Sequence, residues 1–200
     1  RHLDATGRDA DAVAAFRRAL DASPSFLPAQ VAAGRLLIQR REWRALASLW
    51  EAEMRQTEDA DALAAVAFRL GFLWERRLRD FPEADAHAED AYRRVLRVVP
   101  DHLPTLHTLV ELSYRNRNWN AVAHYVERVA DAVADRDVRT SYLCELGAVR
   151  EYHLEDLDGA RRAYRAAFDL DPEQADALFG LIRTDSSEGG GAETIEALRK

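Results

Sequence analysis

The chain has 200 residues, of which 48% are hydrophobic and 32% charged, a balance typical of a soluble chain that folds around a core. Its formal net charge of −7 argues against a general nucleic-acid binder, which needs clustered positive charge. No apolar run approaches the roughly 18 residues of a membrane helix, so we expect no membrane insertion. The single cysteine, Cys144, excludes an internal disulfide and a zinc site built on paired cysteines.

A spaced pattern of small residues, an aromatic residue and a proline stands near the start of the chain. Ala12, Phe16 and Ala19 follow one another at steps of four and three, the spacing of one helix face, and Pro24 comes five residues later. The pattern returns at Ala88, Tyr92, Val95 and Pro100, and again at Ala160, Tyr164, Ala167 and Pro172. Each copy predicts a helix that ends before its proline.

Two weaker copies without the proline lie between these three. One consists of Leu46, Trp50 and Glu53 after Trp43, and the other of Val122, Val126 and Val129 after Trp119. We therefore predict five related helices. We place Trp50 and Trp74 in the core, and Trp43 and Trp119 where they pack the start of a helix, rather than on an RNA-stacking surface.

Each of these helices is preceded by another apolar helix, and two of those contain a Leu-Gly pair. The pairs are Leu70-Gly71 and Leu146-Gly147. A glycine inside a helix costs about 1 kcal/mol relative to alanine, so a compensating contact is needed. We expect close approach of a neighbouring helix backbone at these glycines, and the same role for Gly34 and Gly180.

The order of these residues resembles the tetratricopeptide repeat, a helix-turn-helix unit of about 34 residues. Leu70, Gly71 and Trp74 match its first helix, and residues 12–24 match its second helix. The tryptophan that the family carries early in the first helix is absent here. The resemblance covers nearly the whole chain and implies an all-α fold, a right-handed superhelical solenoid of antiparallel helix pairs. We expect a single domain over residues 1–200 with about five to six repeats, the first and last incomplete, as in a fragment of a longer chain.

The spacing also predicts one irregular turn. Trp43 recurs after 76 residues as Trp119, whereas Pro100 recurs after 72 residues as Pro172. The difference falls within residues 80–91, where we expect a longer turn or an extra helical turn.

Patterns that would carry catalysis or bind a metal are missing from the sequence. No two of the six histidines have the i, i+4 spacing of a helical zinc site, and Cys144 has no neighbouring base. The segment at 185–191, DSSEGGG, lacks the Lys-Ser/Thr of a phosphate loop, and we predict a flexible turn there. We therefore predict no enzyme activity, no cofactor and no metal.

In the family that the chain resembles, the first helices line a concave groove. The residue after the Leu-Gly pair and those three and four further on face this groove, and the prolines set the register of the other repeats. Val31, Cys144, Glu145 and Ala148 also fall on this face. The resemblance thus implies a groove of Arg35, Gln39, Phe68, Arg69, Phe72, Glu75, Arg76, His107, Glu111, Tyr114, Arg115, Glu151 and Tyr152.

Two interpretations of this groove stay open at the level of sequence. Aromatic residues beside arginine and glutamate are typical of a specific binding surface. The same arginines and glutamates could instead pair with one another between adjacent first helices and form a solvated ion lattice. The groove differs from that of family members that grip a terminal carboxylate with lysine, because Lys200 is the only lysine.

The sequence favours a non-catalytic protein–protein interaction scaffold that binds a peptide or helix of a protein partner in its concave groove. An alternative is the regulatory or sensor region of a larger multidomain enzyme, such as a kinase or protease, with further domains in the same polypeptide. A third is an RNA-binding helical-repeat protein, against which the acidic charge speaks. The first residues show no secretory signal, so we expect a cytoplasmic protein.

Overall fold

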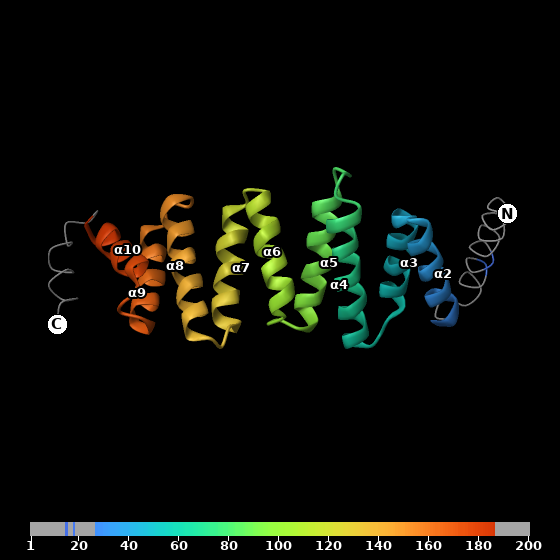
Figure 1. The fold of residues 1–200 in the computed structure, drawn as a ribbon, viewed down its shortest axis with the longest axis horizontal. Helices are drawn as coiled ribbons and strands as arrows, with labels where there is room; N and C mark the ends of the chain where they lie inside the picture. Colours follow the sequence, from blue (N-terminus) through green and yellow to red (C-terminus); the bar gives the residue numbers. More distant parts are fainter. Residues whose placement is uncertain (1–14, 16–17, 19–26, 187–200) are drawn as a thin grey trace. The chain divides into compact units, whose positions relative to one another are not determined.

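The fold is seen in a computed structural model, which describes Ala15, Arg18 and residues 27–186. Nine α-helices follow one another in this part of the chain, and it contains no strand (Figure 1). None of these helices combines the length and hydropathy needed to cross a membrane. The helices are α2 (Leu27–Arg40), α3 (Trp43–Gln56), α4 (Ala60–Arg77), α5 (Ala84–Val98), α6 (Leu103–Arg115), α7 (Trp119–Ala132), α8 (Arg136–Tyr152), α9 (Leu157–Leu170) and α10 (Ala175–Ser186).

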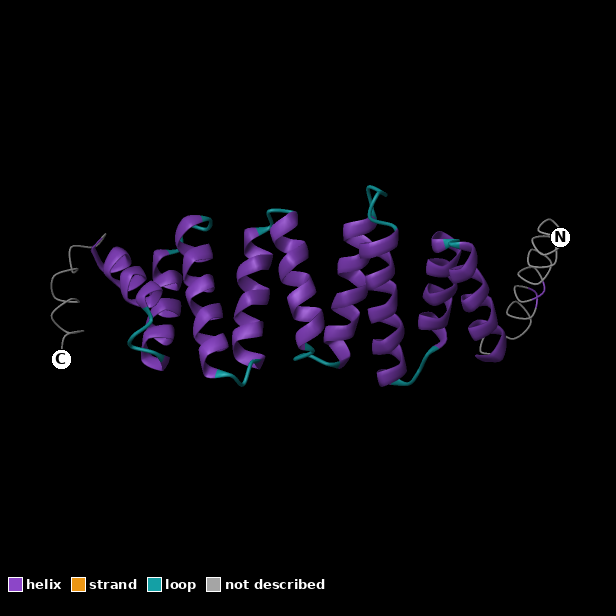
Figure 2. Cartoon of the chain, viewed as in Figure 1, coloured by secondary structure: helices purple, strands orange, loops and turns teal. Residues whose placement is uncertain are grey.

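The chain divides into two compact units, and each is described by itself. The described helices of unit 1, residues 1–100, are α2 to α5, and those of unit 2, residues 101–200, are α6 to α10. Within each unit every helix packs against the next one along the chain, and α8 also contacts α10. Figure 2 shows short turns between neighbouring helices, which therefore run antiparallel. The prediction of an all-α fold built from antiparallel helix pairs is confirmed; we call α2, α4, α6, α8 and α10 the first helices and α3, α5, α7 and α9 the second helices.

Turn residues with unusual backbone geometry set the start of three second helices. Arg41, Arg117 and Glu155 have positive φ angles of 57°, 52° and 56°, and each stands two residues before its second helix begins. In α7 the side chain of Asn118 then accepts a hydrogen bond from the N–H of Ala121 at 3.2 Å, which satisfies one of the unpaired donors of the first turn. These short turns hold the two helices of a pair close together.

The pair α4 and α5 has a longer turn, as the spacing of the prolines predicted. Residues 78–83 form this turn, which projects beyond the ends of the helices (Figure 1). The helices of this pair are also longer than those of the pair α8 and α9. α4 has 18 residues and α5 has 15, whereas α8 has 17 and α9 has 14. The extra residues are therefore shared between the turn and both helices. Arg44 of α3 covers the turn, with its guanidinium 3.9 Å from the centre of the Phe81 ring.

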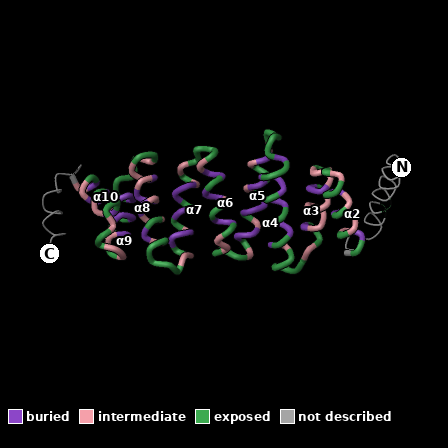
Figure 3. The backbone as a smooth tube through the Cα atoms, viewed as in Figure 1, coloured by how far each residue is buried: buried purple, intermediate pink, exposed green. Residues whose placement is uncertain are grey.

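The tightest packing in both units joins a tyrosine of a second helix to a glycine of a first helix. A methyl group added at Gly71 would lie 2.7 Å from the Tyr92 ring, and one at Gly147 would lie 2.5 Å from the Tyr164 ring. Gly180 of α10 meets the Tyr164 ring as well, at 2.6 Å from such a methyl group. Both rings are fully buried. Figure 3 shows buried segments on the helices of both pairs, α4 and α5 in unit 1 and α8 and α9 in unit 2. The predicted close contacts at Gly71 and Gly147 are confirmed, but the partner is a tyrosine ring and not a helix backbone.

Other expectations were met only in part. Gly34 is not a tight contact, because the nearest atom to an added methyl group would be 3.8 Å away. Trp74 is buried as predicted, whereas Trp50 is half-buried. Of the segment 185–191, predicted as a turn, Asp185 still belongs to α10 and the part from 187 onward lies outside the described residues. The four residues that define the first copy of the repeat pattern, Ala12, Phe16, Ala19 and Pro24, also lie outside them.

We predict that Gly71→Ala and Gly147→Ala each lower the free energy of unfolding by about 1–3 kcal/mol, because the new methyl group overlaps a buried tyrosine ring. Gly34→Ala is the matched control. The space around Gly34 accepts a methyl group, and the higher helix propensity of alanine should raise stability by up to about 1 kcal/mol. Urea unfolding followed by circular dichroism measures all three variants, and equal losses would contradict this packing.

Candidate binding surface of the first helices

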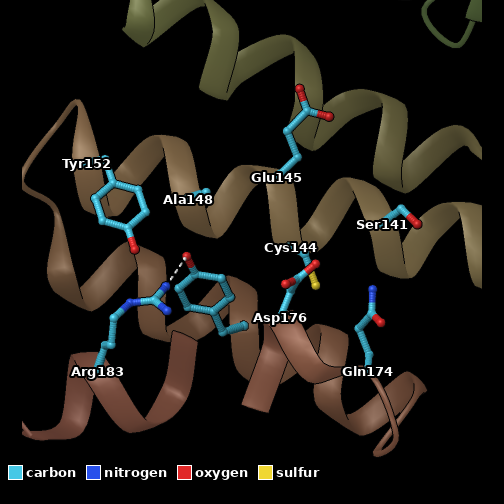
Figure 4. A pocket seen from close by; sticks show the side chains of 9 residues that line it. Ser141, Cys144, Glu145, Ala148, Tyr152, Gln174, Asp176 and Arg183 are labelled. Carbon is cyan, nitrogen blue, oxygen red and sulfur yellow. Dashed lines mark hydrogen bonds between the residues drawn. The ribbon is translucent and has the colours of Figure 1, made fainter. Parts of the chain in front are cut away.

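Unit 2 contains a pocket between the first helices α8 and α10, with a volume of about 460 Å³. Tyr164 of α9 and Gln174, in the turn before α10, also line it. Figure 4 shows Tyr152 of α8 and Arg183 of α10 facing each other and Asp176 of α10 beside Cys144 of α8, whereas the Glu145 carboxylate points away from α10. We call this the unit 2 pocket. Its lining consists of Ser141, Cys144, Glu145, Ala148, Tyr152, Tyr164, Gln174, Asp176 and Arg183.

One face of α8 supplies most of this lining. Ser141, Glu145, Ala148 and Tyr152 follow one another at steps of four, three and four, which keeps them on the same side of the helix. Tyr152 is 60% exposed. The sequence had placed Glu145, Ala148 and Tyr152 on the groove side of α8, and the structure puts all three in the pocket wall.

Glu151 was predicted to face a partner, but in the structure it binds groups of its own chain. Arg183 of α10 donates two hydrogen bonds to the two carboxylate oxygens, at 2.8 and 2.9 Å, and the hydroxyl of Tyr164 donates a third at 2.8 Å. Hydrogen bonding from Arg183 holds the pKa of the Glu151 carboxyl below its usual value, against the opposing effect of burial. At this position the arginine and glutamate of adjacent first helices do pair, as the second interpretation of the groove proposed.

Tyr114 and His107 of α6 also have partners within unit 2. The hydroxyl of Tyr114 donates to Glu145 of α8 at 2.7 Å, and burial together with this bond raises the pKa of Tyr114. The imidazole of His107 stacks on the Tyr142 ring, with centroids 5.8 Å apart. These side chains therefore link α6 to α8, and Tyr114 is less available to a partner than its sequence position suggested.

Unit 1 contains a smaller pocket of about 320 Å³ beside the first helices α2 and α4. Two predicted groove residues, Arg35 and Arg69, line it. Arg69 forms an ion pair with Glu53 at 3.1 Å and lies 5.1 Å from the centre of the Trp50 ring. The lining of this unit 1 pocket consists of Gln30, Val31, Gly34, Arg35, Ile38, Trp50, Glu53 and Arg69.

The other groove residues predicted on α4 differ in how far their side chains are exposed to a partner. Glu75 is buried, with 7% of its side chain exposed, and it accepts a hydrogen bond from the hydroxyl of Tyr92 at 2.9 Å. Phe68 packs against the Tyr92 ring, with centroids 5.7 Å apart. Phe72 is 50% exposed, and Arg76 lies 6.0 Å from the centre of its ring. The prediction that Glu75 faces a partner is therefore wrong, whereas Phe72 and Arg76 do face outward.

Of the thirteen predicted groove residues, Arg35, Arg69 and Tyr152 line one of the two pockets and the other ten line neither. Gln39, Glu111 and Arg115 are exposed on first helices. Sequence reasoning missed Asp176 and Arg183 of α10, because the register of the groove was anchored on Leu-Gly pairs and α10 carries Phe-Gly instead. The glycine of that pair, Gly180, was the signal that could have placed them.

Cys144, one of the lining residues of the unit 2 pocket, is not an activated nucleophile. Burial, and next the negative charge of Asp176, raises the pKa of the Cys144 thiol to about 11, so this thiol stays protonated and is a poor nucleophile at neutral pH. The described residues contain no group of three or more histidine, cysteine or acidic side chains placed to hold a metal ion.

The contact that decides the type of fold is shared by the pairs α4–α5 and α8–α9. In each pair the glycine of a Leu-Gly sequence in the first helix receives the tyrosine ring of the second helix. The fold is a tetratricopeptide-like helical repeat. The tetratricopeptide-like pattern is less regular in α6, where Val110 stands at the glycine position and the following second helix carries Val126 in place of tyrosine.

Solved structures similar to the chain include two tetratricopeptide repeat proteins. YrrB, described as a TPR protein with an unusual peptide-binding site, is 16% identical, with 91% of this chain and 88% of that chain covered and a TM-score of 0.47. A tetratricopeptide repeat protein from Parabacteroides merdae is 12% identical, with 98% and 73% covered and a TM-score of 0.48. BtubC from P. vanneervenii is 16% identical, with 96% and 85% covered and a TM-score of 0.42. No protein-family model and no curated protein sequence matches the chain. The packing of tyrosine rings on glycines within the chain itself identifies the fold.

We predict that Glu151 makes stability depend on pH. Its folded pKa lies below the ordinary value of 4.5, so its contribution is complete above pH 4.5 and is lost as the pH falls through the lower folded value. Glu151→Gln should lower the free energy of unfolding at pH 7 by about 1–3 kcal/mol. The free energy of unfolding of this variant should also fall less steeply than that of the natural chain between about pH 5 and pH 3.

Glu155→Gln, in the exposed turn after α8, is the control and should leave both the stability and its pH dependence unchanged. Chemical unfolding at a series of pH values measures how the free energy of unfolding of each variant changes with pH, which is the slope compared here. A slope for Glu151→Gln identical to that of the natural chain would contradict the assigned role of the carboxylate.

Proposed function

We propose that the chain is a non-catalytic interaction scaffold that binds a peptide or a helix of a protein partner on the exposed faces of its first helices. One observation carries the proposal. Each unit has a pocket on its first helices, and an exposed aromatic side chain lies on those helices in each unit: Phe72 on α4 in unit 1 and Tyr152 on α8 in unit 2.

The composition of these faces supports recognition of a protein segment. Tyrosine, phenylalanine and arginine are enriched at the centres of protein interfaces, and a few such anchors supply most of the binding energy. In unit 2, Tyr152 lines the pocket directly, and Arg183 lies 5.5 Å from the centre of its ring. The hydrogen bonds from Arg183 to Glu151 already fix the arginine side chain. Binding of a partner therefore loses little conformational entropy at Arg183.

The pockets suit side chains better than whole small molecules. Both are open at the surface of helices, and their walls mix aliphatic, aromatic and charged groups. A peptide lying along a first helix would place successive side chains against residues at steps of three and four, the spacing of the α8 face. We therefore expect specificity to come from a few side chains of the partner.

The test selects ligands from a random peptide display library against the natural chain and measures their affinity by fluorescence anisotropy. We predict that Phe72→Ala and Tyr152→Ala each weaken the peptides that dock on their unit by about tenfold or more, because an aromatic anchor contributes about 2 kcal/mol. Both side chains are exposed, so the variants should keep the circular dichroism and melting temperature of the natural chain.

Phe81→Ala is the matched control. Phe81 is also a partly exposed phenylalanine, but it lies in the turn at 78–83 and not on a first helix. Selected peptides that bind equally well to the Phe72 and Tyr152 variants would show that the first helices are not the binding surface, and the proposal would fail.

A further inference from the structure

The first helices of unit 1 carry more basic than acidic side chains. α2 contains two arginines and no acidic residue, and α4 contains three arginines, Asp61 and Glu75. Glu75 is buried and already accepts a hydrogen bond from the hydroxyl of Tyr92. The exposed faces of these two helices therefore have an excess of positive charge, which attracts a partner of the opposite sign.

One positive charge in the unit 1 pocket is not matched by an acidic group. Three of the residues that line this pocket are charged: Arg35, Glu53 and Arg69. Glu53 and Arg69 form an ion pair at 3.1 Å. Arg35 is exposed, and among the residues that the structure describes no side chain forms an ion pair or a hydrogen bond with it. The pocket wall therefore presents an arginine that is available to a carboxylate.

Apolar groups lie on either side of this arginine along α2. Val31 stands four residues before Arg35 and Ile38 stands three residues after it, so the three side chains share one face of the helix. Val31 is 46% exposed and Ile38 is 47% exposed. The half-buried ring of Trp50, from α3, adds an aromatic group to the same lining. A ligand that covers these groups removes apolar surface from water, which favours binding.

Gly34 gives the pocket room that the packing of the helices does not require. At Gly71 and Gly147 a tyrosine ring takes the space of a side chain, but a methyl group added at Gly34 would lie 3.8 Å from the nearest atom, an ordinary contact. A glycine inside a helix is less favourable than alanine, and no tight contact compensates for it at this position. Gly34 lines the pocket, so its missing side chain leaves space for a ligand beside α2.

We propose that the unit 1 pocket binds an acidic segment of the partner, in which an aspartate or glutamate stands next to an apolar side chain. Arg35 binds the carboxylate, because a guanidinium can donate two parallel hydrogen bonds to it. The neighbouring apolar side chain covers Val31 and Ile38 and meets the ring of Trp50. A basic side chain would meet Arg35 as a like charge. This inference rests on the proposed function and adds the chemistry of the partner.

A peptide fits this pocket better than the phosphates of a nucleic acid. Binding to a nucleic acid depends on several cations placed along its backbone, whereas the pocket offers one unpaired arginine beside aliphatic and aromatic groups. The net charge of −7 would also repel a polyanion.

The probe is N-acetyl-Leu-Glu-methylamide, added to the isotopically labelled full chain and followed through chemical shifts. N-acetyl-Leu-Gln-methylamide is the neutral analogue of the same shape, and N-acetyl-Leu-Lys-methylamide carries the opposite charge. We expect the Leu-Glu probe to shift the amides of Val31, Arg35 and Ile38 and the indole N–H of Trp50 in a saturable way. The Leu-Gln probe should bind about tenfold more weakly, and the Leu-Lys probe should not bind.

Two variants separate the charge from the space. Arg35→Gln should weaken the Leu-Glu probe to the level of the Leu-Gln probe, whereas Arg55→Gln, an exposed arginine of α3 outside the pocket, changes the net charge equally and should have no effect. Gly34→Leu should weaken both probes several-fold without lowering the melting temperature, because leucine fills the pocket and has a higher helix propensity than glycine. An equal loss in the Arg55 variant would assign the attraction to general charge and would overturn the inference.

The two proposals fail in different ways. If the Leu-Glu probe shifts none of the pocket residues, or if Leu-Gln binds as well as Leu-Glu, the inference is overturned. A uridine oligonucleotide that shifts the same amides and displaces the Leu-Glu probe would assign the site to phosphate and would overturn it too. If selected peptides still bind in a manner that needs Phe72, the proposed function survives these results with a partner of different chemistry. If their binding needs neither Phe72 nor Tyr152, the proposed function fails as well.

Discussion

A tyrosine ring laid directly on a glycine organises both units of the chain. Tyr164 shows the contact most fully: its ring meets Gly147 of α8 and Gly180 of α10, and its hydroxyl donates to Glu151. One buried side chain of a second helix thus touches both adjacent first helices. The glycines are required because any larger residue would overlap the ring, and this requirement offsets their poor helix propensity.

The same tyrosines determine which polar groups remain on the surface. The hydroxyl of Tyr164 helps to fix Glu151, which in turn fixes Arg183, so three helices share one hydrogen-bonded network. In unit 1 the hydroxyl of Tyr92 draws Glu75 into the interior. These two glutamates serve the packing of the helices. The surface left for a partner consists of the residues that this packing does not use.

The sequence was sufficient to predict the helices, their pairing and the special glycines, because spacing along a helix follows directly from residue order. It did not predict that Glu75 and Glu151 bind tyrosine hydroxyls. That outcome depends on the distance between two helices and on side-chain rotamers, which no pattern within a single helix encodes. Gly34 differs from Gly71 for a related reason: it is followed by a second helix with tryptophan, Trp50, which is half-buried and lines the unit 1 pocket.

We propose that partners dock on the first helices and leave the second helices free. Intermolecular nuclear Overhauser effects between the labelled full chain and a selected peptide that needs Tyr152 test it most directly. We predict contacts from the peptide to the methyl group of Ala148 and the ring of Tyr152, and none to the exposed second-helix residues His124 and Arg165. Contacts to His124 or Arg165 without any to Ala148 or Tyr152 would contradict it.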